Sequence, residues 1–572
     1  MFKTDNSNRG YFFLILLVVV VHFLEASAIN DRGESMVTSS HTIQRWGSVR
    51  LAENLQKYIE HETLRLKVIT NFSAHEEEIP FVEQRLKEFK IIHEELLKNT
   101  SNTAFHNSFK KNHPTTVFAA IRNFLAAFEE KLANQTKYGK RLREFLEAND
   151  VKPLPTRLDL ERTSTAITVI QATYNISMSD LLAGSIKGNQ GEPLTPSDCY
   201  DIGKTVLKSG LLDTAQEWLG VAISGFDLAT VEKAQLTFNL SDALISLAKI
   251  YYRRKENDKA LPLFEKAAEL DPENPVAHQE FVRHRFGRNV ELVADLNRDK
   301  VEPWRKKYFD MCQNSTNITW LQEQRLTKSQ KSNLKCRLRR SSSCPFLFYK
   351  EEILSNSPFI SLILNFVADL EIKELKNLTL DQLTSEPLPG NEVGVMWHFK
   401  GSTFKDVTGD VIAQISQRVG DVASMKVFQS TTNTYSLGEP LNVIDYGIGG
   451  LNLPHAELNQ KYNVRYMSII NGARAATVQV FLSDTVLGGA TVFIHQNITI
   501  VPQKGLAVFW HNYQPNGLPE PYLLPATCPL AVGENIVIEK GMWRLGLDEQ
   551  FKCGRKRKSS HTTLEVGWRM PS

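Results

Sequence analysis

Residues that could carry chemistry gather in the last third of this 572-residue chain. An imidazole and a carboxylate stand two positions apart at His455 and Glu457, and further imidazoles follow at His495 and His511. Imidazoles and carboxylates are groups that bind metal ions in proteins. Whether a metal site exists here therefore depends on the elements that bring these side chains together.

The amino terminus indicates the compartment. Lys3 and Arg9 precede the apolar run Tyr11–Leu24, and Ala26-Ser27-Ala28 follows it. This pattern predicts a secretory signal peptide over residues 1–28, with cleavage before Ile29. A signal anchor is the alternative, although the apolar core is short for a bilayer of about 30 Å. We expect the mature chain in the endoplasmic reticulum lumen, without a membrane segment.

Nine Asn-x-Ser/Thr sequons fit that compartment. They are Asn71, Asn99, Asn134, Asn175, Asn239, Asn314, Asn317, Asn377 and Asn497. An oxidising lumen also favours disulfides among the six cysteines. We pair Cys312 with Cys336, which bracket a polar stretch, and Cys528 with Cys553, which bracket the last predicted strands. Cys199 falls on a helical packing position and is expected to be a buried free thiol.

Composition indicates an ordinary globular protein, with 42% hydrophobic and 23% charged residues. The 67 basic and 64 acidic residues leave a net charge of +3, which argues against a nucleic-acid binder. The expected fold class is α+β with several domains. Apolar stripes at helical spacing predict an N-terminal helical region over 42–180. Its Val82–Leu96 seam suits either an intramolecular bundle or a homodimer of two chains.

Residues 196–285 contain an internal repeat. In the second copy, Leu244, Ala248, Ala260 and Phe264 fall on the offsets of a tetratricopeptide helix pair. The first copy lies 45 residues earlier and begins at Cys199. Such a unit presents a concave face to a peptide, although a purely structural use is the alternative.

A polar, basic stretch over 286–345 is expected to be a linker clipped by its disulfide. Over 346–553, short runs rich in Val, Ile and Phe alternate with Gly and Pro turns, which predicts a sandwich or jelly roll. The basic tail, 554–572, is expected to be solvated.

The motifs of this last domain carry a resemblance. They are Tyr446-Gly447-Ile448-Gly449-Gly450, Pro454-His455, Ser483-Asp484, Gly488-Gly489-Ala490-Thr491-Val492-Phe493, Lys504-Gly505, Phe509-Trp510 and Cys528-Pro529. With the order of the preceding regions, the chain resembles the alpha subunit of collagen prolyl 4-hydroxylase over nearly all of its mature length. The resemblance implies a double-stranded β-helix (jelly roll) that binds Fe(II) and 2-oxoglutarate, with Tyr446 among the 2-oxoglutarate contacts.

The resemblance also implies an activity and partners. Members of the family hydroxylate peptidyl proline in collagen-like, proline-rich peptides in the endoplasmic reticulum, using oxygen and ascorbate. They assemble with protein disulfide isomerase as the beta subunit, which supplies the retention signal. The same partner would have to retain this chain, which ends in Met570-Pro571-Ser572.

The site departs from the family pattern at three positions. The metal-binding motif has Glu457 where the family has Asp, and the extra methylene moves the oxygens by roughly 1.5 Å where a preorganised site tolerates about 0.5 Å. Pro525 occupies the position of the second imidazole and has no lone pair to offer. Asn535 replaces the Lys that pairs with 2-oxoglutarate. Lys540, five residues on, is expected to face the other side of the strand.

Other residues are weak substitutes. An inward orientation of His511 at a strand end is one alternative, but a core or surface role is the simpler expectation for it and for His495. No spacing favours Arg474. In the peptide groove, the family's tyrosines align with Ser246, Lys249 and Tyr252, so Tyr252 is the remaining peptide-binding candidate. Two interpretations follow: a working or impaired hydroxylase, and a non-catalytic subunit of the same family that binds peptide or assists assembly.

Overall fold

The computed structural model describes most of the chain between residues 112 and 543. The described residues are 60, 63, 112–125, 156–228, 238–272, 278–281, 303–315, 335–341, 344, 346–385, 399–404, 410–425, 427, 438–455, 474–514, 520 and 522–543. The predicted signal peptide, the Val82–Leu96 seam and the basic tail lie outside them. Among the described helices, none is long and apolar enough to cross a membrane.

The N-terminal helical region is represented by three helices and a short hairpin. They are α6 (Pro114–Leu125), α8 (Arg157–Tyr174), α9 (Met178–Leu182) and the strands β1 (Ser185–Ile186) and β2 (Asn189–Gln190). A capping box between Thr156 and Asp159 starts α8, and Asn175 ends it in the left-handed conformation. The predicted stripe on this helix, which includes Ile167 and Ile170, is fully buried.

The repeat region forms two consecutive helix pairs. They are α10 (Pro196–Lys208) with α11 (Leu212–Leu228), and α12 (Leu240–Arg253) with α13 (Asn257–Leu270). Ala248, Ala260 and Phe264 are buried, as the repeat spacing predicts. Cys199 is a buried free thiol, as expected, and burial raises its pKa to about 12.

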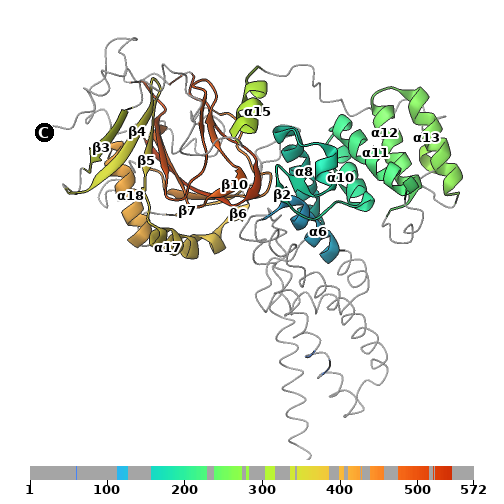
Figure 1. Ribbon diagram of the computed structural model, residues 1–572, viewed down its shortest axis with the longest axis horizontal. Helices are drawn as coiled ribbons and strands as arrows, with labels where there is room; N and C mark the ends of the chain where they lie inside the picture. Colours follow the sequence, from blue (N-terminus) through green and yellow to red (C-terminus); the bar gives the residue numbers. More distant parts are fainter. Residues whose placement is uncertain are drawn as a thin grey trace, which may run out of the picture. The chain divides into compact units, whose positions relative to one another are not determined.

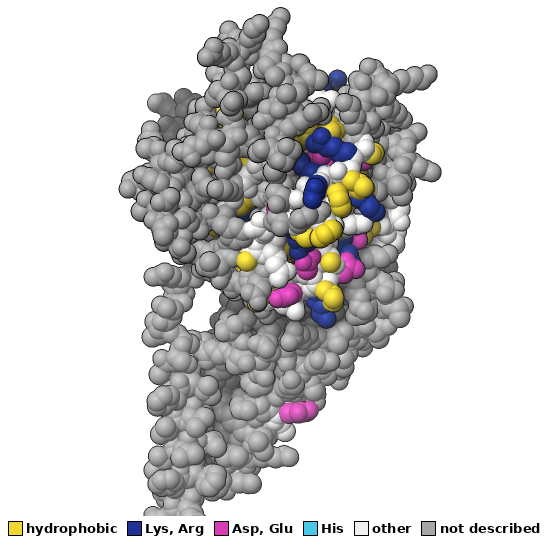
Figure 2. Space-filling model, turned by 90° about the vertical axis from the view of Figure 1, so that its left-hand side faces the viewer, with side chains coloured by type: hydrophobic (Ala, Val, Ile, Leu, Met, Phe, Trp, Pro, Cys, Tyr) yellow, Lys and Arg dark blue, Asp and Glu magenta, His cyan; other side chains and the backbone are white. Residues whose placement is uncertain are grey.

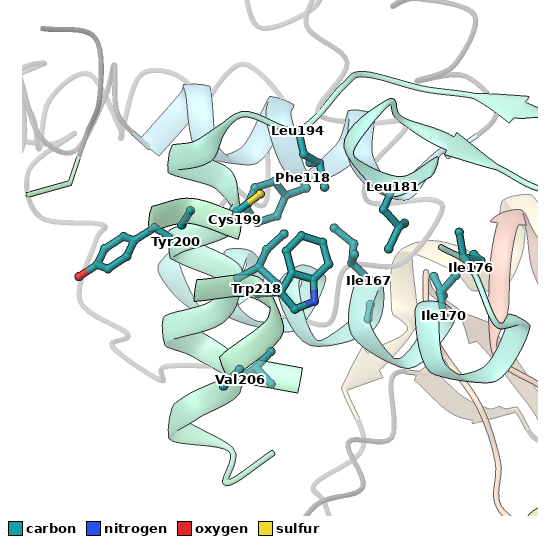
Figure 3. Close-up of a cluster of buried hydrophobic side chains, with 14 of the residues drawn as sticks. Phe118, Ile167, Ile170, Ile176, Leu181, Leu194, Cys199, Tyr200, Val206 and Trp218 are labelled. Atoms are coloured by element: carbon teal, nitrogen blue, oxygen red, sulfur yellow. The ribbon is translucent and has the colours of Figure 1, made fainter. Parts of the chain in front are cut away.

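One hydrophobic cluster joins these helices, and Figure 3 shows Trp218 at its centre beside Ile167 and Phe118. The indole nitrogen of Trp218 donates a hydrogen bond to the Gln171 side chain at 3.0 Å, so this buried polar atom is satisfied. The same cluster includes Ile448 from the β-rich region. The helices and the sheets therefore share part of a core.

The C-terminal region is built on a nine-stranded antiparallel sheet with the order β3-β4-β5-β13-β9-β16-β8-β7-β6. Its strands are β3 (Lys335–Arg340), β4 (Phe348–Asn356), β5 (Phe359–Leu364), β6 (Thr384–Ser385), β7 (Phe399–Phe404), β8 (Leu441–Tyr446), β9 (Arg474–Phe481), β13 (Ala507–His511) and β16 (Asn535–Trp543). Two smaller antiparallel sheets accompany it. Their orders are β12-β11-β14 and β10-β15, formed by β10 (Thr485–Gly488), β11 (Thr491–Phe493), β12 (Ile498–Ile500), β14 (Pro525–Thr527) and β15 (Leu530–Gly533).

The large sheet has an apolar layer on each face. On one face, Val478 and Ile538 pack in a cluster with residues of α17 (Asp369–Thr379) and α18 (Asp410–Ala423), which lie along the sheet in Figure 1. The short helix η4 (Leu380–Gln382) follows α17. On the other face, Phe481 and Val537 pack with Phe493 of the three-stranded sheet. The predicted α+β fold class is confirmed at the level of mixed helices and sheets, and the large sheet is antiparallel.

The linker and disulfide predictions need correction. Residues 286–345 contain a 13-residue helix, α15 (Pro303–Ser315), and the strand β3. Cys312 of this helix is bonded to Cys528, so both predicted pairings, Cys312–Cys336 and Cys528–Cys553, are wrong. Cys336 is an exposed free thiol, and Cys553 lies outside the described residues. The predictions failed because α15 packs on the outer side of β11 and β14 through Tyr308 and Met311, which brings distant cysteines together.

Candidate active site

Tyr446 and Asn535 lie side by side at the ends of two neighbouring strands. They are direct partners in the β8–β16 ladder, and both are 1% exposed. The Tyr446 hydroxyl lies 3.5 Å from the Thr527 hydroxyl of β14. The large and the three-stranded sheets therefore meet at this point, which is where the resemblance locates the 2-oxoglutarate site.

The segment after β8 runs alongside β14 and carries His455. Asn452 and Thr527 exchange backbone hydrogen bonds at 3.1 and 2.8 Å, and the His455 amide donates to the Pro525 carbonyl at 3.3 Å. The structure thus places position 525 directly beside the retained imidazole. A second imidazole here would stand next to the first, but the chain has a pyrrolidine ring instead.

The ring of His455 is oriented as a metal ligand would be. Its Nδ1 lies 2.9 Å from the Leu453 carbonyl oxygen. Because a carbonyl only accepts, this nitrogen carries the proton and Nε2 keeps its lone pair, an arrangement common for metal-bound histidine. One imidazole of the predicted set is therefore preserved in a usable state. Glu457 lies outside the described residues.

The amide of Asn535 cannot replace a lysine electrostatically. Its Nδ2 donates to the Gly489 carbonyl at 3.2 Å, which fixes the amide orientation. Its buried Oδ1 has no hydrogen-bond partner. The free atom is therefore an acceptor, which repels a carboxylate where a cation would attract it.

Polar side chains continue along the same face of the large sheet, and they include the carboxylate of Glu539. Thr491 donates to the Gln479 carbonyl oxygen at 2.9 Å, and the Gln479 amide lies 3.3 Å from Glu539. Gln479 and Glu539 are partners in the β9–β16 ladder, and the β16 register puts Glu539 on the same face as Asn535. A dianion such as 2-oxoglutarate would meet one more carboxylate in this part of the structure.

The alternative ligands lie elsewhere. His511 packs edge-on against Phe509 on the opposite face of the large sheet, and His495 packs against the exposed Tyr522. Arg474 pairs with Glu439 at 2.5 Å, and the Lys540 ammonium donates to the Glu439 carbonyl. Lys540 is on the other face of β16 from Asn535, as the strand periodicity predicts.

The described residues therefore do not fit the iron and 2-oxoglutarate set of the family. They offer one imidazole, a proline in place of the other, and an amide whose free atom is an acceptor. Among them, no group of three or more His, Cys, Asp or Glu side chains is arranged to hold a metal.

The predicted peptide groove on α12 is only partly available. Ser246 is buried, and Lys249 forms an ion pair with Glu280 at 2.6 Å. Tyr252 is half-buried and packs at the edge of the second helix pair. The sequence pattern missed Tyr200 of α10, which stacks on Phe238 with ring centroids 4.7 Å apart. Repeat spacing does not predict this contact, because Phe238 lies outside the repeat positions.

Five of the predicted sequons are in the described part of the chain. Asn175, Asn239, Asn314, Asn377 and Asn497 are all exposed, so each is sterically open to a glycan. The asparagines at 71, 99, 134 and 317 lie outside the described residues.

Comparisons with known proteins point to one family. The family described as "Prolyl 4-Hydroxylase alpha-subunit, N-terminal region" matches residues 48–188, and a tetratricopeptide repeat matches residues 241–274. The prolyl 4-hydroxylase subunit alpha-1 of Caenorhabditis elegans is 26% identical over 532 residues, covering 88% of this chain and 90% of the relative. The subunit alpha-1 of Mus musculus is 27% identical over 422 residues, covering 70% and 76%.

Among solved structures, the viral collagen prolyl hydroxylase of Paramecium Bursaria Chlorella virus-1, described as a 2OG complex, matches at 20% identity with a TM-score of 0.25. It covers 32% of this chain and 95% of its own. The sequence matches span both the helical and the β-rich regions, in the order found here. This chain is therefore similar to prolyl 4-hydroxylase alpha subunits over most of its length.

Proposed function

We propose that this chain is a non-catalytic prolyl 4-hydroxylase alpha-like subunit. Its relatives bear the name of an enzyme that hydroxylates peptidyl proline. The family activity is that of a procollagen-proline 4-dioxygenase, which uses Fe(II), 2-oxoglutarate, oxygen and ascorbate. The observation that carries the proposal is Pro525 directly beside His455, together with the buried, unsatisfied acceptor of Asn535. In this proposal the β-rich domain is retained as a folded support rather than as a catalyst.

The finer architecture and setting belong to the same proposal. The nine-stranded and three-stranded sheets, packed through Phe481 and Phe493, would be the two layers of a double-stranded β-helix. The chain would work in the endoplasmic reticulum lumen, glycosylated at exposed sequons and assembled with protein disulfide isomerase. Its helical region would support a homodimer.

A proline-rich peptide is the proposed ligand of the repeat domain. Support comes from the two helix pairs and from Tyr252, against which a polyproline II strand can stack. Binding of a capped nonaproline peptide to the full chain would be measured by calorimetry, with Tyr252→Ala expected to weaken it at least fivefold. Tyr522→Ala, at an exposed tyrosine of the β-rich domain, is the matched control. Equal loss in both variants would contradict a groove at Tyr252.

The metal question has a direct test. We expect anaerobic titration of the purified chain with Fe(II) and 2-oxoglutarate to give no visible charge-transfer band. A strong band would retire the non-catalytic proposal and favour the second candidate, a working hydroxylase. The observation that supports this second candidate is the contact of His455 Nδ1 with the Leu453 carbonyl oxygen, which puts the proton on Nδ1.

Assembly can be tested separately. Co-purification from microsomes is expected to recover protein disulfide isomerase with the chain. Recovery of the free chain alone would count against that partner without affecting the metal experiment.

A further inference from the structure

The strand β3 forms one end of the nine-stranded sheet, and within the described residues no strand pairs with its outer edge. It pairs with β4 over six residues, with Lys335 opposite Ile353 at one end and Arg340 opposite Phe348 at the other. The outer edge of such a strand presents backbone N–H and C=O groups to any further strand. A partner segment of similar length could therefore extend the sheet.

One face of β3 is anchored to the sheet by a buried acid. Arg337 Nε lies 2.6 Å from Glu351, and Arg339 lies 2.9 Å from the other oxygen of the same carboxylate. Ser361 also donates to Glu351 at 2.9 Å. These contacts hold the strand on one face. Leu338 and Arg340, which alternate with Arg337 and Arg339, therefore project from the opposite face.

That opposite face exposes large hydrophobic side chains. Leu338 is 67% exposed and Phe348 is 51% exposed, and the adjoining Phe346 is 92% exposed. Four of the ten exposed large hydrophobic residues among the described positions fall between 338 and 348. Figure 2, viewed from the side where β3 lies in Figure 1, shows hydrophobic and basic side chains interspersed. Clustered exposure of this kind marks an interaction site.

Exposed basic side chains outnumber acidic ones on this face of the β3–β4 pair. Arg340 and Lys350 are exposed here, whereas Glu352, opposite Cys336, is half-buried. The register pairs Leu338 with Lys350 and Arg340 with Phe348, so basic and apolar groups alternate on one face. Charges alone would protect an edge from aggregation, but exposed phenylalanines work against that role.

We propose that this surface, the β3 edge (Leu338, Arg340, Phe348 and Lys350), docks an extended acidic segment of a partner protein. The segment adds to the sheet as a strand through backbone hydrogen bonds. Its carboxylates lie against Arg340 and Lys350, and its apolar side chains cover Leu338 and Phe348. Main-chain pairing supplies affinity and the alternating side chains supply selectivity.

The probe is a capped, fluorescent octapeptide, Glu-Thr-Val-Thr-Glu-Thr-Val-Thr, whose carboxylates and valines share one face when extended. Its binding to the full chain is measured by anisotropy at 50 and 300 mM salt. We expect the double variant Arg340→Glu, Lys350→Glu to weaken binding at least tenfold and Leu338→Ser about fivefold. Binding should also weaken at high salt. All three positions are exposed, so folding should be unchanged, as thermal melting will verify.

Matched controls separate the β3 edge from general charge. The double variant Lys306→Glu, Lys373→Glu changes the net charge equally at exposed sites on α15 and α17, and Leu370→Ser removes an exposed leucine of α17. Both should bind within twofold of the parent. A peptide with Lys in place of Glu, and one N-methylated at alternate residues, should bind at least tenfold more weakly.

The proposal is overturned if the acidic peptide fails to bind at 1 mM, or if the N-methylated peptide binds equally. Equal weakening in the control variants would show a non-specific charge effect. Binding to phosphatidylserine vesicles without binding to the peptide would assign the surface to anionic lipid instead.

Discussion

At the scale of single residues, the proposed loss of catalysis depends on Pro525 and Asn535 in the β-rich region. Proline offers no metal ligand, and the Asn535 amide presents an acceptor where the family presents a cation. Both side chains are well packed, since Pro525 is buried in β14 and Asn535 is 1% exposed. The changes are therefore built into a folded domain.

Restoring the family residues tests this conclusion. We expect Pro525→His, Asn535→Lys and Glu457→Asp together to produce the Fe(II)–2-oxoglutarate band and turnover of a proline-rich peptide, because they supply the second imidazole, the shorter carboxylate and the cation. The triple variant with Gln at all three positions is the control. If the restored chain melts normally but gains no band, the pocket has lost more than these groups.

A second prediction concerns His113, whose ring is packed against Gly191 and whose Nε2 lies 3.2 Å from the Asn189 carbonyl. Burial lowers the pKa of His113 from 6.5 to about 4. Between these values the unfolded chain binds more protons than the folded chain. The stabilising contribution is therefore complete above pH 6.5 and is lost as the pH falls toward 4.

We expect the loss in the free energy of unfolding to reach at most about 3 kcal/mol, because the pKa of His113 differs by roughly 2.5 units between the unfolded and folded chains. The free energy of unfolding, measured with urea between pH 4.5 and 7.5, should depend less steeply on pH in His113→Gln than in the parent chain. His495→Gln, at an exposed position, should keep the parent slope. An unchanged slope in His113→Gln would show that another group controls acid stability.

At the scale of elements, the disulfide of α15 is the feature that changes most from expectation. Cys312 and Cys528 are separated by 216 residues in sequence. Tyr308 of the same helix donates to the Thr527 carbonyl at 2.9 Å, so α15 lies against β14 by two independent contacts. A helix that sequence polarity assigned to a linker is thereby part of the β-rich domain.

Non-reducing digestion and mass spectrometry should find the Cys312 peptide linked to the Cys528 peptide. Cys528→Ser should lower the free energy of unfolding by up to about 5 kcal/mol, the chain-entropy value for so long a loop. Cys344→Ser, at an exposed free thiol, is the control and should have little effect. A Cys528–Cys553 linkage would contradict the arrangement described here.

At the scale of the whole molecule, α8 connects the helices to the sheets. The Tyr174 hydroxyl donates to the Pro529 carbonyl, and both groups are buried. A Cβ on Gly449, which has φ +71°, would approach within 2.5 Å of Ala166. The two regions are therefore packed as tightly as a protein interior.

Enlarging this contact should destabilise both regions together. We expect Ala166→Leu to lower the free energy of unfolding by about 1–3 kcal/mol, because it overpacks the α8 surface against Gly449. The change should be seen equally by circular dichroism of the helices and by fluorescence of Trp510 in a variant whose other tryptophans are replaced by Phe. Leu370→Ser on exposed α17 is the control, and loss of helical signal before any change at the sheet would contradict shared packing.

Local pattern alone identified much of this protein. Short runs rich in Val, Ile and Phe over 346–553 predicted the region that contains β8, β9, β11 and β13. Repeat spacing located the helix pair around Ala248 and Phe264, and strand alternation correctly put Lys540 on the face opposite Asn535. The substitutions at Pro525 and Asn535 were also visible, because they occur at fixed distances from Cys528. These features depend on spacing along the chain, which sequence records directly.

Tertiary structure decided what depends on distant contacts. It paired Cys312 with Cys528, turned His511 to the apolar face beside Phe509 and put Pro525 against His455. It also placed β3 at the end of the large sheet, as far as the described strands go. These outcomes depend on how helix and sheet faces that are hundreds of residues apart in sequence pack together. Many apolar contacts compete in that packing, and local spacing along the chain does not encode the result.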